Sequence, residues 1–125
     1  MPITEGARGE SILAVGDEEY RLLYTNRALV EAEQRCGKSI TSIAARAADN
    51  DLAAGDVANL LVVGLEAARR DARIGGRGYN INNALELMDK AGFGNAAAAV
   101  FAGVGAVLGY DPDDEPQEER EGPPV

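Results

Sequence analysis

The fold of this chain is decided by residues 9–40, which include GESILAVG (9–16), YRLLYT (20–25), ALVEAE (28–33) and GKSI (37–40). The first two runs are typical of strands, and turn-forming residues separate them. The third run is typical of a helix and follows the second strand almost directly. Because a two-stranded hairpin is only marginally stable alone in water, we expect it to lie on the helices.

The two strands are predicted near residues 10–15 and 19–25, with a turn that starts at Gly16. Glycine and the acidic residues after it tolerate the unusual backbone angles that such a turn needs. Ile12 and Ala14 point to one side of the first strand, since side chains alternate along a strand.

Helical periodicity continues from the hairpin to about residue 109. Thr25 or Asn26 caps the first helix, and Gly37 ends it in a left-handed conformation. The clearest predicted helix, 56–70, follows the apolar i, i+3, i+4, i+7 template without a break. The predicted helices are 27–36, a short helix capped by Ser39, 56–70, a helix from Asn80 or Asn82 to Gly92, and about 94–109.

These elements predict a mostly α fold with a short N-terminal β-hairpin, an α+β class with about five helices. Residues 1–110 form one globular domain, with the hairpin at about 10–25 and the helices at about 27–109. Residues 111–125 contain four of the five prolines and seven acids against one arginine. We expect this acidic, proline-rich tail to be disordered, because it has no apolar content to offset the entropy of ordering.

Charge and composition exclude several classes of protein. The net charge of −9 argues against nucleic-acid binding, which needs a basic surface. The N-terminus lacks the features of a signal peptide, and we interpret the uncharged stretch 93–110 as a packed helix without a membrane role. Cys36 is the single cysteine, which fits a reducing cytosol, and is expected to be a small core residue.

Residue chemistry gives no sign of an enzyme, a metal site or a cofactor. The chain has no histidine, the commonest general base and metal ligand. The run Gly37-Lys38-Ser39 lacks the earlier glycine and the strand of a phosphate loop. The glycines at 75, 76 and 78 lack the spacing of a dinucleotide loop and are expected to form a flexible connection.

Glu33 and a cluster of arginines each have both a structural and a binding interpretation. Glu33 falls on the apolar stripe of its helix, where it either reaches water or accepts backbone N–H groups near Ser39. We favour a structural role over a binding role. The arginine cluster of Arg69, Arg70, Arg73 and Arg77 either complements a helix C-terminus and the acidic tail or contacts an acidic partner.

The order and spacing of the opening runs resemble a known family. The chain is similar here to the tail assembly chaperones of tailed phages and gene transfer agents, a family also called tail tube proteins. The similar features are, in order, GE and the hairpin, the strand that ends in LLYT, the helix with ALVEAE, Gly37, and the SI that begins the next helix. The resemblance is close over about a quarter of the chain and looser to about Tyr110. It concerns a scaffold, since none of these residues does chemistry.

The resemblance implies a non-enzymatic morphogenesis factor in the bacterial host cytoplasm. Such a protein keeps the tape measure protein soluble, helps recruit tail tube subunits and is absent from the mature particle. The alternative is a structural subunit of the tail tube, which generally needs a larger sheet than two strands provide. A third hypothesis, a small-molecule enzyme, is opposed by the absence of histidine and of any catalytic constellation.

The last helix is the expected partner-binding or self-association surface. Its large apolar residues are Val100, Phe101, Val104 and Leu108, and its other side is mostly alanine and glycine. A helix that is apolar all round is normally buried, so one side should meet another chain. Arg69, Arg70 and Arg73 are the second candidate contact.

Overall fold

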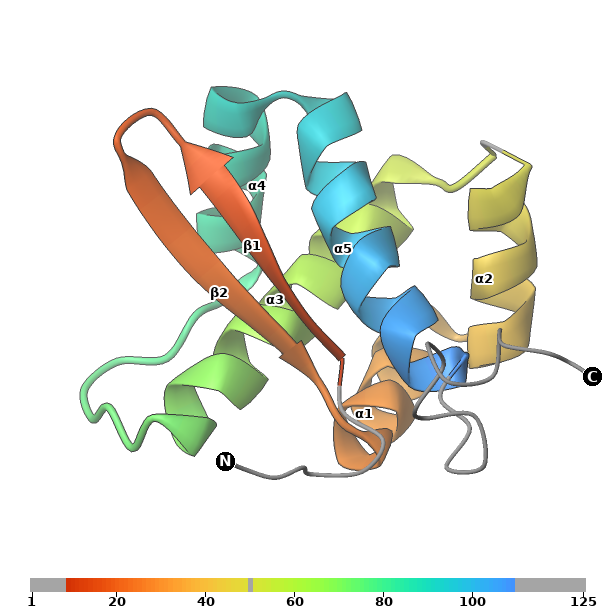
Figure 1. Cartoon of the computed structure of the whole chain (residues 1–125), viewed down its shortest axis with the longest axis horizontal. Coiled ribbons are helices and arrows are strands. Elements are labelled where there is room, and N and C mark those ends of the chain that lie inside the picture. Colours follow the sequence, from red (N-terminus) through yellow and green to blue (C-terminus); the bar gives the residue numbers. More distant parts are fainter. Residues whose placement is uncertain (1–8, 50, 110–125) are drawn as a thin grey trace, which may run out of the picture.

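A computed structural model describes residues 9–49 and 51–109. It confirms the predicted α+β class: an antiparallel hairpin precedes five helices in this part of the chain (Figure 1). The predicted tail at 111–125 lies outside the described residues. The elements are β1 (Gly9–Val15), β2 (Glu18–Tyr24), α1 (Asn26–Cys36), α2 (Ile40–Ala48), α3 (Ala54–Asp71), α4 (Ile81–Ala91) and α5 (Phe93–Leu108).

Along β1 the hairpin turns one face towards the helices and the other towards solvent, whereas Leu22 and Leu23 at the end of β2 are both buried. Its register pairs Gly9 with Tyr24 and Val15 with Glu18, and the turn residue Gly16 has a positive φ of 60°. Leu13 is buried. Ile12 and Ala14 share the outward side, and Ile12 is 51% exposed.

Local side-chain chemistry sets the ends of the helices. Thr25, and not Asn26, caps α1 by accepting from the Ala28 backbone N at 3.1 Å. Gly37 ends α1 at φ 71°, as predicted. The other two predicted N-caps also bond residues within three positions. Ser39 caps α2 by accepting from the backbone N of Ser42, and Asn80 caps α4 through a reciprocal capping box with Asn83.

Helix α3 is the centre of the molecule. It packs against β2, α1, α4 and α5, and most of its length is buried. Figure 1 shows the hairpin lying across α3, with α5 beside β1 and α2 on the far side of α5. The core is thus built between one small sheet and a layer of helices.

Tyr24 joins the hairpin to both long helices. Its side chain is fully buried, and its Oη donates to the Leu60 carbonyl oxygen at 2.8 Å. A Cβ on Gly64 of α3 or on Gly103 of α5 would come within 2.5 Å and 2.6 Å, respectively, of Tyr24 atoms. The two glycines therefore allow the helices to close on the ring from both sides.

Within residues 9–49 and 51–109, no single helix is long and apolar enough to cross a bilayer. Helices α4 and α5 reach such a length and composition only when taken together, and the chain bends by 117° between them.

Candidate partner-binding surface

The predicted apolar face of the last helix is divided between core and surface. Val100 and Val104 are each 1% exposed and belong to the core, so they are not available to a partner. Phe101 is 37% exposed and Leu108 is 38% exposed. This part of the prediction is corrected: the buried side of α5 is the side with Gly103, because β1 approaches α5 there.

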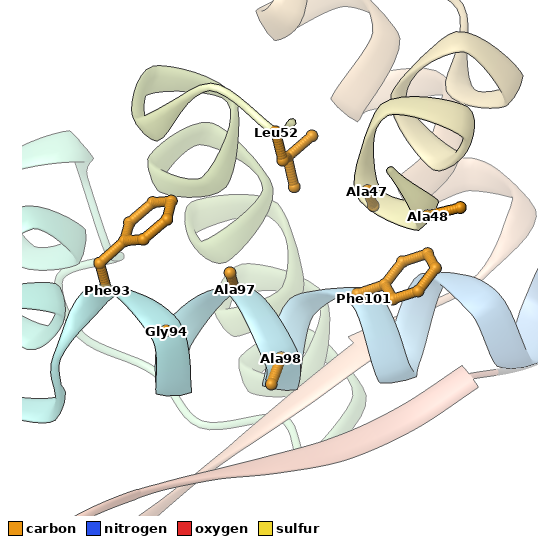
Figure 2. A pocket seen from close by; sticks show the side chains of 8 residues that line it. All are labelled: Ala47, Ala48, Leu52, Phe93, Gly94, Ala97, Ala98 and Phe101. Carbon is orange, nitrogen blue, oxygen red and sulfur yellow. The ribbon is translucent and has the colours of Figure 1, made fainter. Parts of the chain in front are cut away.

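The exposed side of α5 forms one wall of an apolar groove, and α2 and the segment after it form the other (Figure 2). The groove has a volume of about 500 Å³. The rings of Phe93 and Phe101 stand on either side of Ala97, and Leu52 faces them from across the groove. The residues that line the groove are Ala47, Ala48, Leu52, Phe93, Gly94, Ala97, Ala98 and Phe101.

The groove is unusual in having no charged side chain among its lining residues. Helix α5 has none in its whole length, and α2 has only Arg46. Ala98, Ala102 and Ala106 are exposed, so the small-residue side of α5 faces outward as well. An uncharged surface on which two aromatic rings flank small residues suits an apolar helix.

The sequence did not point to the α2 half of the groove or to Phe93. Phe93 is 46% exposed and lies at the first position of α5, directly after Gly92. The available signal was the spacing of Phe93 and Phe101, which are separated by about two helical turns on an uncharged helix. The contribution of α2 depends on tertiary packing, which periodicity does not report.

Two residues of the arginine cluster are held by glutamates. Arg69 donates from both Nε and Nη2 to Glu66, and Arg70 lies 3.3 Å from an oxygen of Glu31. Arg73 follows α3 in a left-handed conformation at φ 59°. Arg69 and Arg70 therefore each make an ion pair with a glutamate, and Arg70 and Arg73 are both exposed.

Glu66 also organises the connection between α3 and α4. Its Oε2 accepts from the Tyr79 backbone N, and Arg69 donates to the Ile74 carbonyl oxygen at 2.8 Å. A Cβ on Gly78 would lie 2.8 Å from a Glu66 oxygen, so a larger residue there would displace the Glu66 carboxylate. The Arg69 hydrogen bond is the largest of the causes that lower the pKa of Glu66. The predicted flexible connection is thus tied to α3 at two points.

Glu33 acts as the backbone acceptor that the sequence suggested. Its Oε2 accepts from the Ile40 backbone N at 2.8 Å, at the first residue of α2. This bond satisfies one of the free N–H groups at a helix start. Glu33 therefore has a structural contact, and this hydrogen bond joins α1 to α2.

The Gly37-Lys38-Ser39 run and Cys36 also have structural contacts. Lys38 Nζ lies 3.0 Å from Oδ2 of Asp56, a carboxylate that is 5% exposed near the start of α3. Cys36 is partly buried beside this pair, and burial raises the pKa of its thiol to about 11. A protonated thiol is a poor nucleophile.

The described part of the chain contains no group of three or more His, Cys, Asp or Glu side chains arranged to hold a metal ion. Its hydrogen bonds and ion pairs mostly fasten one element to another. The α2–α5 groove is therefore the surface in this part of the protein that most resembles a binding site.

Comparison with known proteins identifies one family. The family model described as phage tail tube protein, GTA-gp10, matches residues 8–109. The match covers the hairpin and all five described helices. No curated protein and no solved structure matches the chain.

Proposed function

This chain belongs to the phage tail tube protein, GTA-gp10 family, and from that premise we propose that it is a non-enzymatic tail assembly chaperone. In this proposal it binds the tape measure protein in the bacterial host cytoplasm, keeps that protein soluble and helps recruit tail tube subunits. It then leaves before the particle is complete. Phage and gene transfer agent tails are the shared setting of the family.

The observation that supports this proposal is the uncharged groove between α2 and α5. A long helical partner that exposes apolar side chains aggregates unless another apolar surface covers them. The groove offers such a surface, with Phe93 and Phe101 as anchors for the apolar face of a helix. The net charge of −9 would keep the resulting complexes soluble.

A structural subunit of the tail tube is the second candidate, and the family description itself favours it. Tube subunits generally build their rings from a large sheet. In the part of the chain that the structure describes, the sheet has two strands, and one face of it is covered by helices. This architecture is the reason for ranking the chaperone first.

Quantitative mass spectrometry separates the two candidates. The chaperone proposal predicts that the protein is present in lysates of producing cells and missing from purified particles. Stoichiometric presence in purified tails, at the level of the tube, would overturn the proposal and favour the tube subunit.

Co-expression with the tape measure protein tests the groove. Phe93→Ser and Phe101→Ser should leave the tape measure protein in the insoluble fraction, whereas the wild-type chain keeps it soluble. Val30→Ser is the matched control, because Val30 is 52% exposed on α1 and does not line the groove. If the control and the groove variants behave alike, the groove is not the binding surface.

A further inference from the structure

The uncharged face of α5 raises the question of what covers it in the free protein. Phe93 and Phe101 are both more than a third exposed, and an apolar surface of this kind marks an interaction site. We infer that a second copy of this chain covers the groove, so that two α5 helices pack antiparallel about a two-fold axis. The axis passes between Ala97 and Ala98.

Charge is the first argument for a second copy. Two chains of net charge −9 repel each other, so contacts between like-charged side chains oppose association. Other helices carry exposed charged residues, including Arg27 on α1 and Asp89 on α4. Helix α5 has no charged side chain, so it is the face on which two copies approach with the least repulsion.

Side-chain size along α5 is the second argument. With the axis between Ala97 and Ala98, Phe101 of one copy faces Gly94 of the other, and Phe93 faces Ala102. Each aromatic ring therefore meets a small residue in both directions, which is the self-complementarity that a two-fold interface requires. Gly94 has open space where a Cβ would be, so it can receive a ring.

This inference concerns the same groove as the proposed tape measure site. The second copy and a partner helix would compete for it, and the dimer would have to open before the partner binds. The dimer is tested on the isolated protein, so its failure leaves the proposed function untouched. Failure of the particle and solubility experiments would likewise leave the dimer standing.

Disulfide cross-linking tests the register. In a Cys36→Ser background, Ala98→Cys places the two thiols beside the axis, within the spacing of about 4.4–6.8 Å between Cα atoms that a disulfide accepts. Ala106→Cys is the matched control, because it is also an exposed alanine on α5. Its two copies would be separated by about 25 Å along the helices, at about 1.5 Å per residue.

Mild oxidation should convert the Ala98→Cys chain to a covalent dimer and leave the Ala106→Cys chain monomeric. A monomeric Ala98→Cys chain, or equal cross-linking of both, would overturn the proposed packing. Sedimentation equilibrium of the full wild-type chain should give a dimer. Ala98→Glu should weaken association more than about a hundredfold, because it sets two like charges face to face.

The matched control for Ala98→Glu is Ala45→Glu, an exposed position on α2 that does not line the groove. It should remain a dimer with the wild-type dissociation constant. Both variants should keep the wild-type helical circular dichroism. A monomeric wild-type chain, or an Ala98→Glu chain that associates as tightly as the control, would contradict the inference.

Discussion

Helices α3 and α5 are both rich in alanine, glycine and valine, yet they have different surroundings. Helix α3 buries eleven of its 18 residues among β2, α1, α4 and α5. Helix α5 buries six of its 16 residues, and its other side borders the groove. The helix that carries charged residues is the more buried one. Apolar composition alone therefore does not tell how many sides of a helix the fold covers.

The largest effect should come from adding a methyl group to the covered side of α5. Gly103→Ala places a Cβ 2.6 Å from Tyr24, and this overpacking should lower the free energy of unfolding by about 1–3 kcal/mol. Gly105→Ala meets nothing within 4 Å and should raise it by up to about 1 kcal/mol through helix propensity. Urea unfolding measures both values. Equal effects would remove the distinction between the two sides of the helix.

A smaller effect should come from the hydroxyl that ties the hairpin to α3. Tyr24→Phe keeps the ring between the two helices and removes the bond to Leu60, so it should cost about 0.5–1.5 kcal/mol. Tyr20→Phe is the matched control, because its hydroxyl bonds Glu18 at the exposed end of the hairpin. The control should change the free energy of unfolding by less than about 0.5 kcal/mol. Equal costs would show that the buried bond adds nothing.

The smallest effect should appear as a difference in pH dependence. The pKa of Glu66 on α3 is lowered chiefly by Arg69, so its contribution to stability is present above the ordinary value of 4.5. That contribution is lost as the pH falls through the lower pKa of the folded state. Glu66→Gln should therefore flatten the acid side of the stability curve.

Arg69→Gln removes the same pair from the other partner and should flatten the acid side only in part, because the Tyr79 backbone N–H still lowers the pKa of Glu66. Thermal unfolding between acidic and neutral pH measures the slope for both variants. Wild-type slopes in both would show that the pair is not a source of pH dependence. Helix α5 adds nothing to the pH dependence of stability, because it has no ionisable side chain.

Local features of the fold were predictable from the sequence because the causes are local. The cap at Thr25, the left-handed Gly37 and the cap at Ser39 follow from side chains within three residues of each helix end. The bond between Glu33 and Ile40 was also within reach, since only one short turn separates the two helices. These features need no knowledge of the rest of the chain.

The orientation of α5 was not predictable in the same way. Periodicity groups large apolar residues together, which placed Phe101 and Leu108 with Val100 on one face. The fold instead buries the side with Gly103, because only a residue without a side chain lets Tyr24 approach. That preference comes from a strand about 80 residues earlier, so no window along the helix contains it. The groove was missed for the same reason.

The contact between β1 and α5 has a consequence for synthesis on the ribosome. Ser11 donates to the Ala99 carbonyl oxygen at 2.6 Å, and 88 positions separate the two residues. At about 5–20 residues per second, Ser11 is added to the chain roughly 4–18 s before Ala99 of its covering helix. A nascent chain that stops before α5 therefore lacks the helix that covers β1, although α3 still packs against β2. Truncated products of this kind should be substrates for quality control.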